Sequence, residues 1–99
     1  MAAPLFIGDE ADAAAWRLTG ARVRIVGPGE VVRAVEEALA SDGELVLLSA
    51  SRARELPAAL LERFSTALHP LTLVVPDATG GAQPPDLERL VRSRLGMAS

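Results

Sequence analysis

Residues 6–20, FIGDEADAAAWRLTG, carry the clearest structural signal in the chain. An apolar run of strand length ends just before Asp9, which opens a helix whose first turn is acidic at Glu10 and Asp12. A side-chain oxygen at the helix start caps free backbone amides, and carboxylates there meet the positive end of the helix dipole. Gly20 supplies the left-handed residue that commonly ends a helix. The stretch therefore predicts a strand followed directly by a short helix.

The same alternation continues along the chain. Short apolar runs lie at residues 4–7, 23–26, 45–49 and 71–75, and segments of helix length that are rich in Ala, Glu and Arg separate them. Strands joined by such crossovers form a parallel sheet with right-handed connections and helices on both faces. The sequence therefore predicts an α/β fold with a small four-stranded parallel sheet.

The strands differ in how their apolar residues are arranged. Residues 22–26 alternate arginine with apolar side chains, whereas residues 45–48 are apolar throughout. An alternating strand is typical of a half-exposed position, and outward arginine on a sheet edge discourages stray pairing. We therefore place the second strand at an edge and predict the order 2-1-3-4, a truncated flavodoxin-like or Rossmann-like sheet.

Apolar spacings of three and four residues predict which helix faces cover the sheet. The second helix follows the turn at residues 27–29, the third begins with Pro57 at its first position, and His69 and Pro70 stop it. The fourth follows the polar loop at residues 76–85. The positions expected to face the sheet from these three helices are Val31, Val32, Val35, Ala38 and Leu39, then Leu60, Leu61, Phe64 and Leu68, then Leu87, Leu90, Val91 and Leu95.

Composition narrows the classes of function. The 99 residues are enough for one domain, cysteine is absent, and all ten basic residues are arginine in a chain of net charge -3. Because positive charge is not in excess, nucleic acid is not expected as a partner. The first residues have no basic start, and no apolar run reaches the length of a membrane span, so we expect a cytoplasmic protein without membrane insertion.

Motifs for chemistry are incomplete. A chain without lysine has no P-loop, and residues 27–29, Gly-Pro-Gly, lack the third glycine of a dinucleotide-binding loop. Asp9 and Glu10 resemble the acidic pair of a receiver domain, but Ser49 stands where the acceptor aspartate would end the third strand. The single histidine, His69, has no cysteine or second histidine as a co-ligand. We therefore assign no catalytic residue, no metal site and no cofactor.

Trp16 is the sole tryptophan, and two roles are open for it. An indole on a short alanine-rich helix is most often a core residue whose N–H finds a carbonyl. The alternative is an anchor in an interface, where tryptophan is enriched among the residues that dominate binding energy.

Both ends of the chain resemble one known family. Residues 6–20, with their Ile-Gly-Asp strand end and Trp-Arg-Leu helix end, are similar to the N-terminus of the F subunit of V-type and A-type rotary ATPases. Residues 70–80, PLTLVVPDATG, and 90–96, LVRSRLG, resemble that family's closing strand, its Pro-rich loop and the end of its last helix.

The resemblance implies a non-catalytic rotor subunit. In that family the F subunit binds the coiled-coil D subunit in the central stalk, and through it the catalytic A/B hexamer and the membrane ring, and so couples ATP hydrolysis or synthesis to proton or sodium transport. The resemblance also implies a mobile, regulatory last helix. On this basis we expect an α/β stalk domain at residues 1–78, a hinge loop at 79–85 and a C-terminal helix at 86–99 of the same domain.

Partner contacts are expected on the first and the last predicted helix. The apolar stripe of the last helix is suited to two docking sites, the sheet and a coiled coil, because either buries the same side chains. The expected partner-binding residues are Trp16, Arg17, Leu87, Leu90, Val91, Arg92 and Leu95. The alternative is a degenerate receiver-like regulatory module, or a ligand-binding α/β module that uses Gly8, Asp9, Ser49 and Asp77 at the carboxyl ends of the strands.

Overall fold

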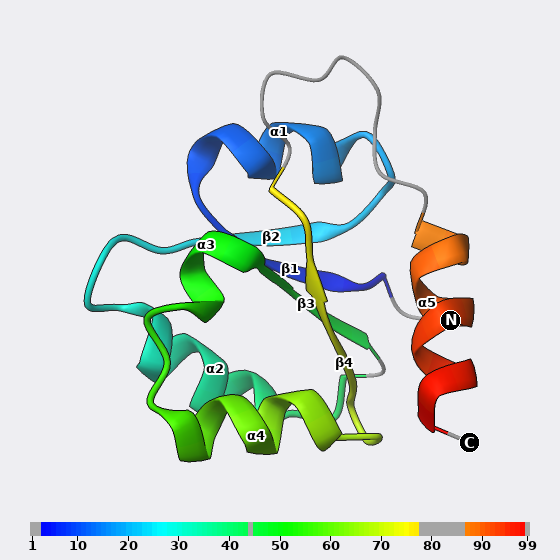
Figure 1. Cartoon of the computed structure of the whole chain (residues 1–99). Coiled ribbons are helices and arrows are strands. Elements are labelled where there is room, and N and C mark those ends of the chain that lie inside the picture. Colours follow the sequence, from blue (N-terminus) through cyan, green and yellow to red (C-terminus); the bar gives the residue numbers. More distant parts are fainter. Residues whose placement is uncertain (1–2, 44, 78–86, 99) are drawn as a thin grey trace.

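The computed structural model describes residues 3–43, 45–77 and 87–98 (Figure 1). In these residues one parallel sheet has the order β2-β1-β3-β4. Its strands are β1 (Leu5–Gly8), β2 (Arg22–Ile25), β3 (Leu45–Ser49) and β4 (Leu71–Val75). The predicted fold class and strand order are confirmed, with the arginine-bearing strand at one edge and the fully apolar strand β3 inside the sheet.

Helices cover both faces of this sheet, as the alternating pattern predicted (Figure 1). Helices α2 (Val31–Leu39), α3 (Ala50–Ala53) and α4 (Ala58–Thr66) pack on one face. Helices α1 (Glu10–Arg17) and α5 (Leu87–Ala98) lie on the other. None of the helices in the described part of the chain is long and apolar enough to cross a membrane.

The face under α2 and α4 holds the larger apolar cluster. Ile7, Val46 and Leu48 contribute from the two inner strands, and Val35 and Phe64 contribute from the helices. The Thr72 hydroxyl, buried at the same layer, donates to the backbone carbonyl of Phe64 and so joins β4 to α4. Apolar burial of this kind stabilises by about 25 cal/mol per Å² of area removed from water. This layer therefore determines which faces of α2 and α4 are buried, and they are the faces that the apolar spacing predicted.

The opposite face is organised by two aromatic rings. Phe6 of β1 and Trp16 of α1 are both fully buried and stack with their ring centroids 5.5 Å apart. A Cβ at Gly8 would stand 2.5 Å from the Phe6 ring, closer than van der Waals contact allows. The glycine after Ile7 is therefore required for packing, because it leaves room for the ring that holds α1 on the sheet.

Local backbone features explain where the helices begin and end. Asp9 caps α1, since its Oδ1 accepts the amide of Asp12 at 3.0 Å, and Gly20 has a φ of +87° as predicted. Pro57 is the N-cap of α4 and not its first helical residue, so the helix begins at Ala58, one residue later than predicted. Ala67 takes an extended backbone, so the helical repeat stops and Leu68 is 61% exposed. The prediction that Leu68 is buried was therefore wrong.

The stacked pair yields a stability prediction. Replacing Trp16 with alanine should lower the free energy of unfolding by about 3–5 kcal/mol, because the change removes a large buried ring and leaves a cavity beside Phe6. Urea unfolding followed by circular dichroism measures the loss. The matched control is Leu18→Ala, two residues along and 71% exposed, which should change stability by less than about 0.5 kcal/mol. Equal losses in the two variants would show that the stack does not hold α1.

Candidate functional site

The predicted partner-binding residues lie on the α1 and α5 side of the sheet. Val91 of α5 packs against the buried cluster that contains Phe6, Trp16 and Leu73. The structure therefore brings Trp16 and Val91, which are distant in sequence, into one apolar layer. The predicted hinge, residues 79–85, lies outside the described residues, as do the side chains of Leu87 and Leu90 within α5.

Trp16 and Arg17 differ in what they offer to a partner. The Trp16 side chain is fully buried, and its indole N–H has no acceptor among the described residues. In this arrangement Trp16 acts as a packing residue and supports the surface from within. Arg17 is half exposed and lies 3.6 Å from the carboxylate of Glu10, a surface ion pair that leaves the guanidinium accessible.

The outer face of α5 combines charge and apolar surface. Arg92 is paired with Glu88 one turn earlier, and both side chains are largely exposed. Leu95, predicted to face the sheet, is 51% exposed, so that prediction was wrong. The reason lies in the placement of α5 beside the edge strand β4, where the sheet ends and leaves the far side of Leu95 uncovered.

One polar contact joins α5 to the end of α4. Arg94 donates from Nη2 to the carbonyl of Ser65 at 2.5 Å, and the same atom lies 3.5 Å from the carbonyl of Ala67. The last carbonyls of a helix have no partner within the helix and carry the negative end of its dipole, so a guanidinium is a favourable neighbour. Arg94 therefore fastens α5 to the body of the domain. Sequence spacing did not reveal this contact, since the partners are 29 residues apart.

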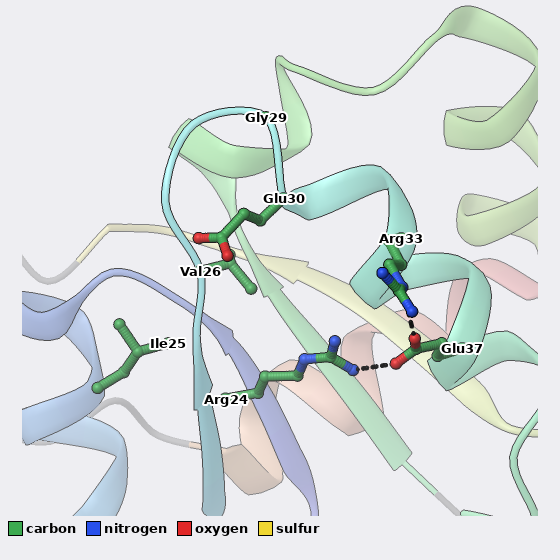
Figure 2. Close-up of a pocket in the computed structure, with 7 residues that line it drawn as sticks. All are labelled: Arg24, Ile25, Val26, Gly29, Glu30, Arg33 and Glu37. Atoms are coloured by element: carbon green, nitrogen blue, oxygen red, sulfur yellow. Dashed lines mark hydrogen bonds and ion pairs between the residues drawn. The ribbon is translucent and has the colours of Figure 1, made fainter.

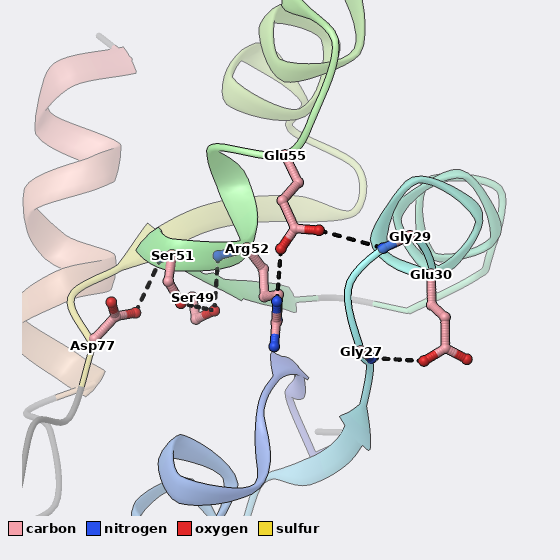
Figure 3. A network of polar contacts seen from close by, with 8 residues as sticks. All are labelled: Gly27, Gly29, Glu30, Ser49, Ser51, Arg52, Glu55 and Asp77. Atoms are coloured by element: carbon pink, nitrogen blue, oxygen red, sulfur yellow. Dashed lines mark hydrogen bonds and ion pairs between the residues drawn. The ribbon is translucent and has the colours of Figure 1, made fainter.

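At the carboxyl ends of the strands, polar side chains bind the protein's own amides (Figure 3). The Ser49 hydroxyl accepts the amide of Arg52, and the Asp77 carboxylate accepts the amide of Ser51 at 3.1 Å. Asp9 caps α1 in the same way. Three of the four residues of the alternative ligand site are thus engaged in local structure, while Gly8 is tightly packed under Phe6.

The backbone amides of the Gly-Pro-Gly turn at residues 27–29 are also hydrogen-bonded to side chains of the protein itself (Figure 3). The amide of Gly27 donates to Glu30 at 2.6 Å, and the amide of Gly29 donates to Glu55 at 3.4 Å. The Glu55 carboxylate is held in turn by Arg52 at 2.7 Å, and this hydrogen bond holds the pKa of Glu55 below its usual value. Carboxylates of the chain occupy amides that a phosphate would use in a dinucleotide-binding loop, in agreement with a turn.

Sequence reasoning missed Arg52, Glu55 and the short helix α3 that carries Arg52. A spacing of three between arginine and glutamate signals the ion pair. The bond from Gly29 to Glu55 joins residues 26 apart and has no local signal. No group of three or more His, Cys, Asp and Glu side chains in the described residues is placed to hold a metal ion.

A groove of about 380 Å³ lies at the outer side of β2, between that strand and α2 (Figure 2). Glu37 receives hydrogen bonds from Arg24 at 2.6 Å and Arg33 at 3.1 Å, and these bonds hold the pKa of Glu37 below its usual value. Glu30 closes the end of the groove beside Gly29. The groove was not predicted, because it requires the edge of β2 and the start of α2 to be placed together.

Comparison with known proteins bears on the fold. No family model and no curated protein sequence matches the chain. Among solved structures it is similar to the F subunit of the V-type ATP synthase from Archaeoglobus fulgidus, with a TM-score of 0.63 and 24% sequence identity. The match covers 74% of this chain and 95% of that chain. The chain has the fold of the F subunit.

The structural match covers nearly all of the solved F subunit. The solved protein belongs to the same family that residues 6–20 and 70–80 resemble. At this identity the likeness establishes the architecture, and the role in an assembly is a separate question. The F-subunit fold here is the four-stranded parallel sheet described above.

The Arg94 contact yields an exchange prediction. Replacing Arg94 with alanine should speed amide hydrogen exchange in α5 about fivefold, because loss of one hydrogen bond of about 1 kcal/mol favours opening of that helix. Exchange in β3 should not change. The control is Arg92→Ala, which removes only an exposed pair within α5. An equal effect of the two substitutions would refute the anchoring role of Arg94.

The Arg52–Glu55 pair yields a pH prediction. A carboxyl whose pKa is lowered on folding stabilises the native state above its unfolded pKa, near 4.5, and that contribution is lost as the pH falls through the folded pKa. Glu55→Gln should therefore reduce stability at neutral pH and weaken its fall in acid, with the two curves meeting at low pH. Thermal unfolding measured between about pH 3 and pH 7 tests this. The control is Glu62→Gln, the same change of charge at an exposed residue of α4; identical profiles for all three proteins would contradict the prediction.

Proposed function

We propose that this chain is a non-catalytic central-stalk subunit of a V-type or A-type rotary ATPase. One observation carries the proposal: the fold likeness covers 95% of a solved F subunit, and short segments at both ends of the chain resemble the same family. A fold alone hosts many functions. The agreement of segments that lie in β1, α1 and β4 with that particular fold is what favours the stalk.

In this role the chain contributes binding surfaces and no catalytic group. It binds the coiled-coil D subunit and so links ATP hydrolysis or synthesis in the A/B hexamer to proton or sodium movement through the membrane ring. We place it in the cytoplasm, peripheral to the membrane as part of that assembly. The expected contact surface is α5, where Arg92 and Leu95 are accessible, together with Arg17 of α1.

The same surface suits a helix with two positions. Val91 is half-buried against the sheet and Leu95 is half exposed, so α5 has apolar area left to bury on a partner helix. Arg94 is the polar contact that release of α5 would break. Regulation of ATP turnover by this helix is part of the proposal.

The polar groups support a role without catalysis. Asp9 is used as a helix cap, Ser49 stands at the end of β3 in place of a receiver's acceptor aspartate, and Glu30 and Glu55 occupy the amides of the Gly-Pro-Gly turn. A receiver-like or ligand-binding module would need some of these groups for its ligand. Thermal-shift measurements with Mg-ATP discriminate, since a ligand-binding module would gain stability with ligand concentration and the stalk protein would not.

The decisive experiment is reconstitution with a coiled-coil D subunit. The purified chain should form a one-to-one complex that survives size-exclusion chromatography. Leu95→Asp should weaken that complex at least about tenfold, because a charge at a half-exposed apolar contact must be desolvated on binding. The control is Ala59→Asp, which adds the same charge on the exposed side of α4.

Two outcomes would contradict different parts of the proposal. Absence of any complex with the D subunit would overturn the stalk role. A complex that is unaffected by Leu95→Asp would keep the stalk role and show that α5 is not the contact surface.

A further inference from the structure

Strand β2 is an open edge of the sheet. The amide of Arg22 donates to the carbonyl of Pro4 at 2.8 Å, and that of Val26 donates to Gly8 at 2.9 Å. Along a strand the backbone amide and carbonyl of one residue point to the same side, and this side alternates from residue to residue. The backbone groups of Arg24 therefore also point toward β1, and those of Val23 and Ile25 point away from the sheet. Within the described residues, no strand pairs with the outward backbone groups of these two residues.

The edge has a definite end. Gly27 is the next residue whose amide points outward, and the carboxylate of Glu30 accepts that amide at 2.6 Å. The start of α2 thus closes the edge at its carboxyl end. The length that remains open suits a short extended segment, not a long strand.

The two sides of this edge differ in chemistry. On the α2 side lies the groove of Figure 2, with Arg24 and Arg33 sharing the single carboxylate of Glu37. Arg22 points to the same side by strand alternation and is exposed. On the α1 side, Ile25 is 44% exposed. A segment laid along β2 would therefore meet guanidinium groups on one side and an apolar side chain on the other.

We propose that β2 takes up an extended segment of a partner protein as a fifth strand, and that this segment alternates acidic and apolar side chains. Its backbone would pair with Val23 and Ile25, its carboxylates would enter the groove at Arg24 and Arg33, and its apolar side chains would cover Ile25. Addition of a strand to an exposed edge is a common mode of peptide recognition, in which side-chain pockets set specificity.

Charge selects this occupant over a second copy of the chain. Two β2 strands paired with each other would bring Arg22 and Arg24 of both copies to one edge, and like charges across strands are destabilising. Three arginines, Arg22, Arg24 and Arg33, lie on the groove side of β2. Two carboxylates lie there with them: Glu37 at the centre of the groove, and Glu30 at its closed end, where it already accepts a backbone amide. The inference does not depend on the proposed stalk function.

Two synthetic peptides test the proposal on the full chain. One is a seven-residue peptide of alternating valine and glutamate, and the other has lysine in place of glutamate. Titration followed by amide NMR should show the glutamate peptide shifting the signals of Val23 and Ile25, with binding about tenfold tighter than that of the lysine peptide.

Three variants assign the binding to this edge. Arg33→Glu, at a side chain that is 85% exposed, should abolish the preference for glutamate. Ile25→Pro should abolish binding of both peptides, because it removes an outward amide and leaves the pairing with β1 intact. The control is Arg63→Glu, an equal change of charge on α4, which packs against the opposite edge strand β4; it should keep the preference within about twofold.

The proposal is overturned if the glutamate peptide leaves Val23 and Ile25 unchanged, or if both peptides bind equally to the wild-type chain. It is also overturned if Arg33→Glu behaves as Arg63→Glu does. Concentration-dependent shifts of the same amides without peptide would show that the edge pairs copies of the chain, and would overturn it as well. Because Arg33 lies on the surface, its variant keeps the test decisive even if Ile25→Pro does not fold.

Discussion

The stack of Phe6 on Trp16 determines how one whole face of the molecule is built. Phe6 comes from an inner strand and Trp16 from the helix that follows it, so the pair fixes the first strand-helix unit in three dimensions. The ring of Phe6 occupies space that a side chain at residue 8 would fill, and glycine is required there for that reason. Val91 of α5 then packs on the layer that this pair creates. The placement of α5 thus depends on an aromatic contact made at the other end of the chain.

A second constraint acts at the carboxyl ends of the strands, where ligands bind in many folds of this type. Amides that are left over from turns and helix starts must find acceptors, and here the chain supplies its own. Asp9, Glu30, Glu55 and Asp77 each accept a backbone amide. This arrangement stabilises the loops and also uses the groups that would bind phosphate or magnesium. In the described part of the chain, the surfaces left for interaction are therefore the edges of the sheet and the outer helix faces.

The sequence allowed the sheet order to be predicted because the two kinds of strand differ in a visible way. Arginine alternates with apolar residues at 22–26, and no polar residue interrupts 45–48, so exposure could be assigned from side chains alone. The same reasoning failed at Leu68 and Leu95. At Leu68 the helix ended earlier than the spacing predicted, so that residue lies outside α4. At Leu95 the residue lies within α5 as predicted, but its burial depended on where the sheet ended, which is a tertiary property. Long-range polar contacts such as that from Arg94 to Ser65 have no periodic signal either.

The two edges of the sheet are used in different ways, and this separates two modes of binding. At the β4 edge, α5 lies alongside the strand, and in the proposed function it would present a helical surface to a coiled coil. At the β2 edge, the backbone itself is open beside a groove lined by arginine. The two inner strands lie between these edges, so a helical partner and an extended segment would not compete for the same residues. Under the two proposals the chain would join two partners at once, and the rigid sheet between the edges would keep their positions fixed relative to each other.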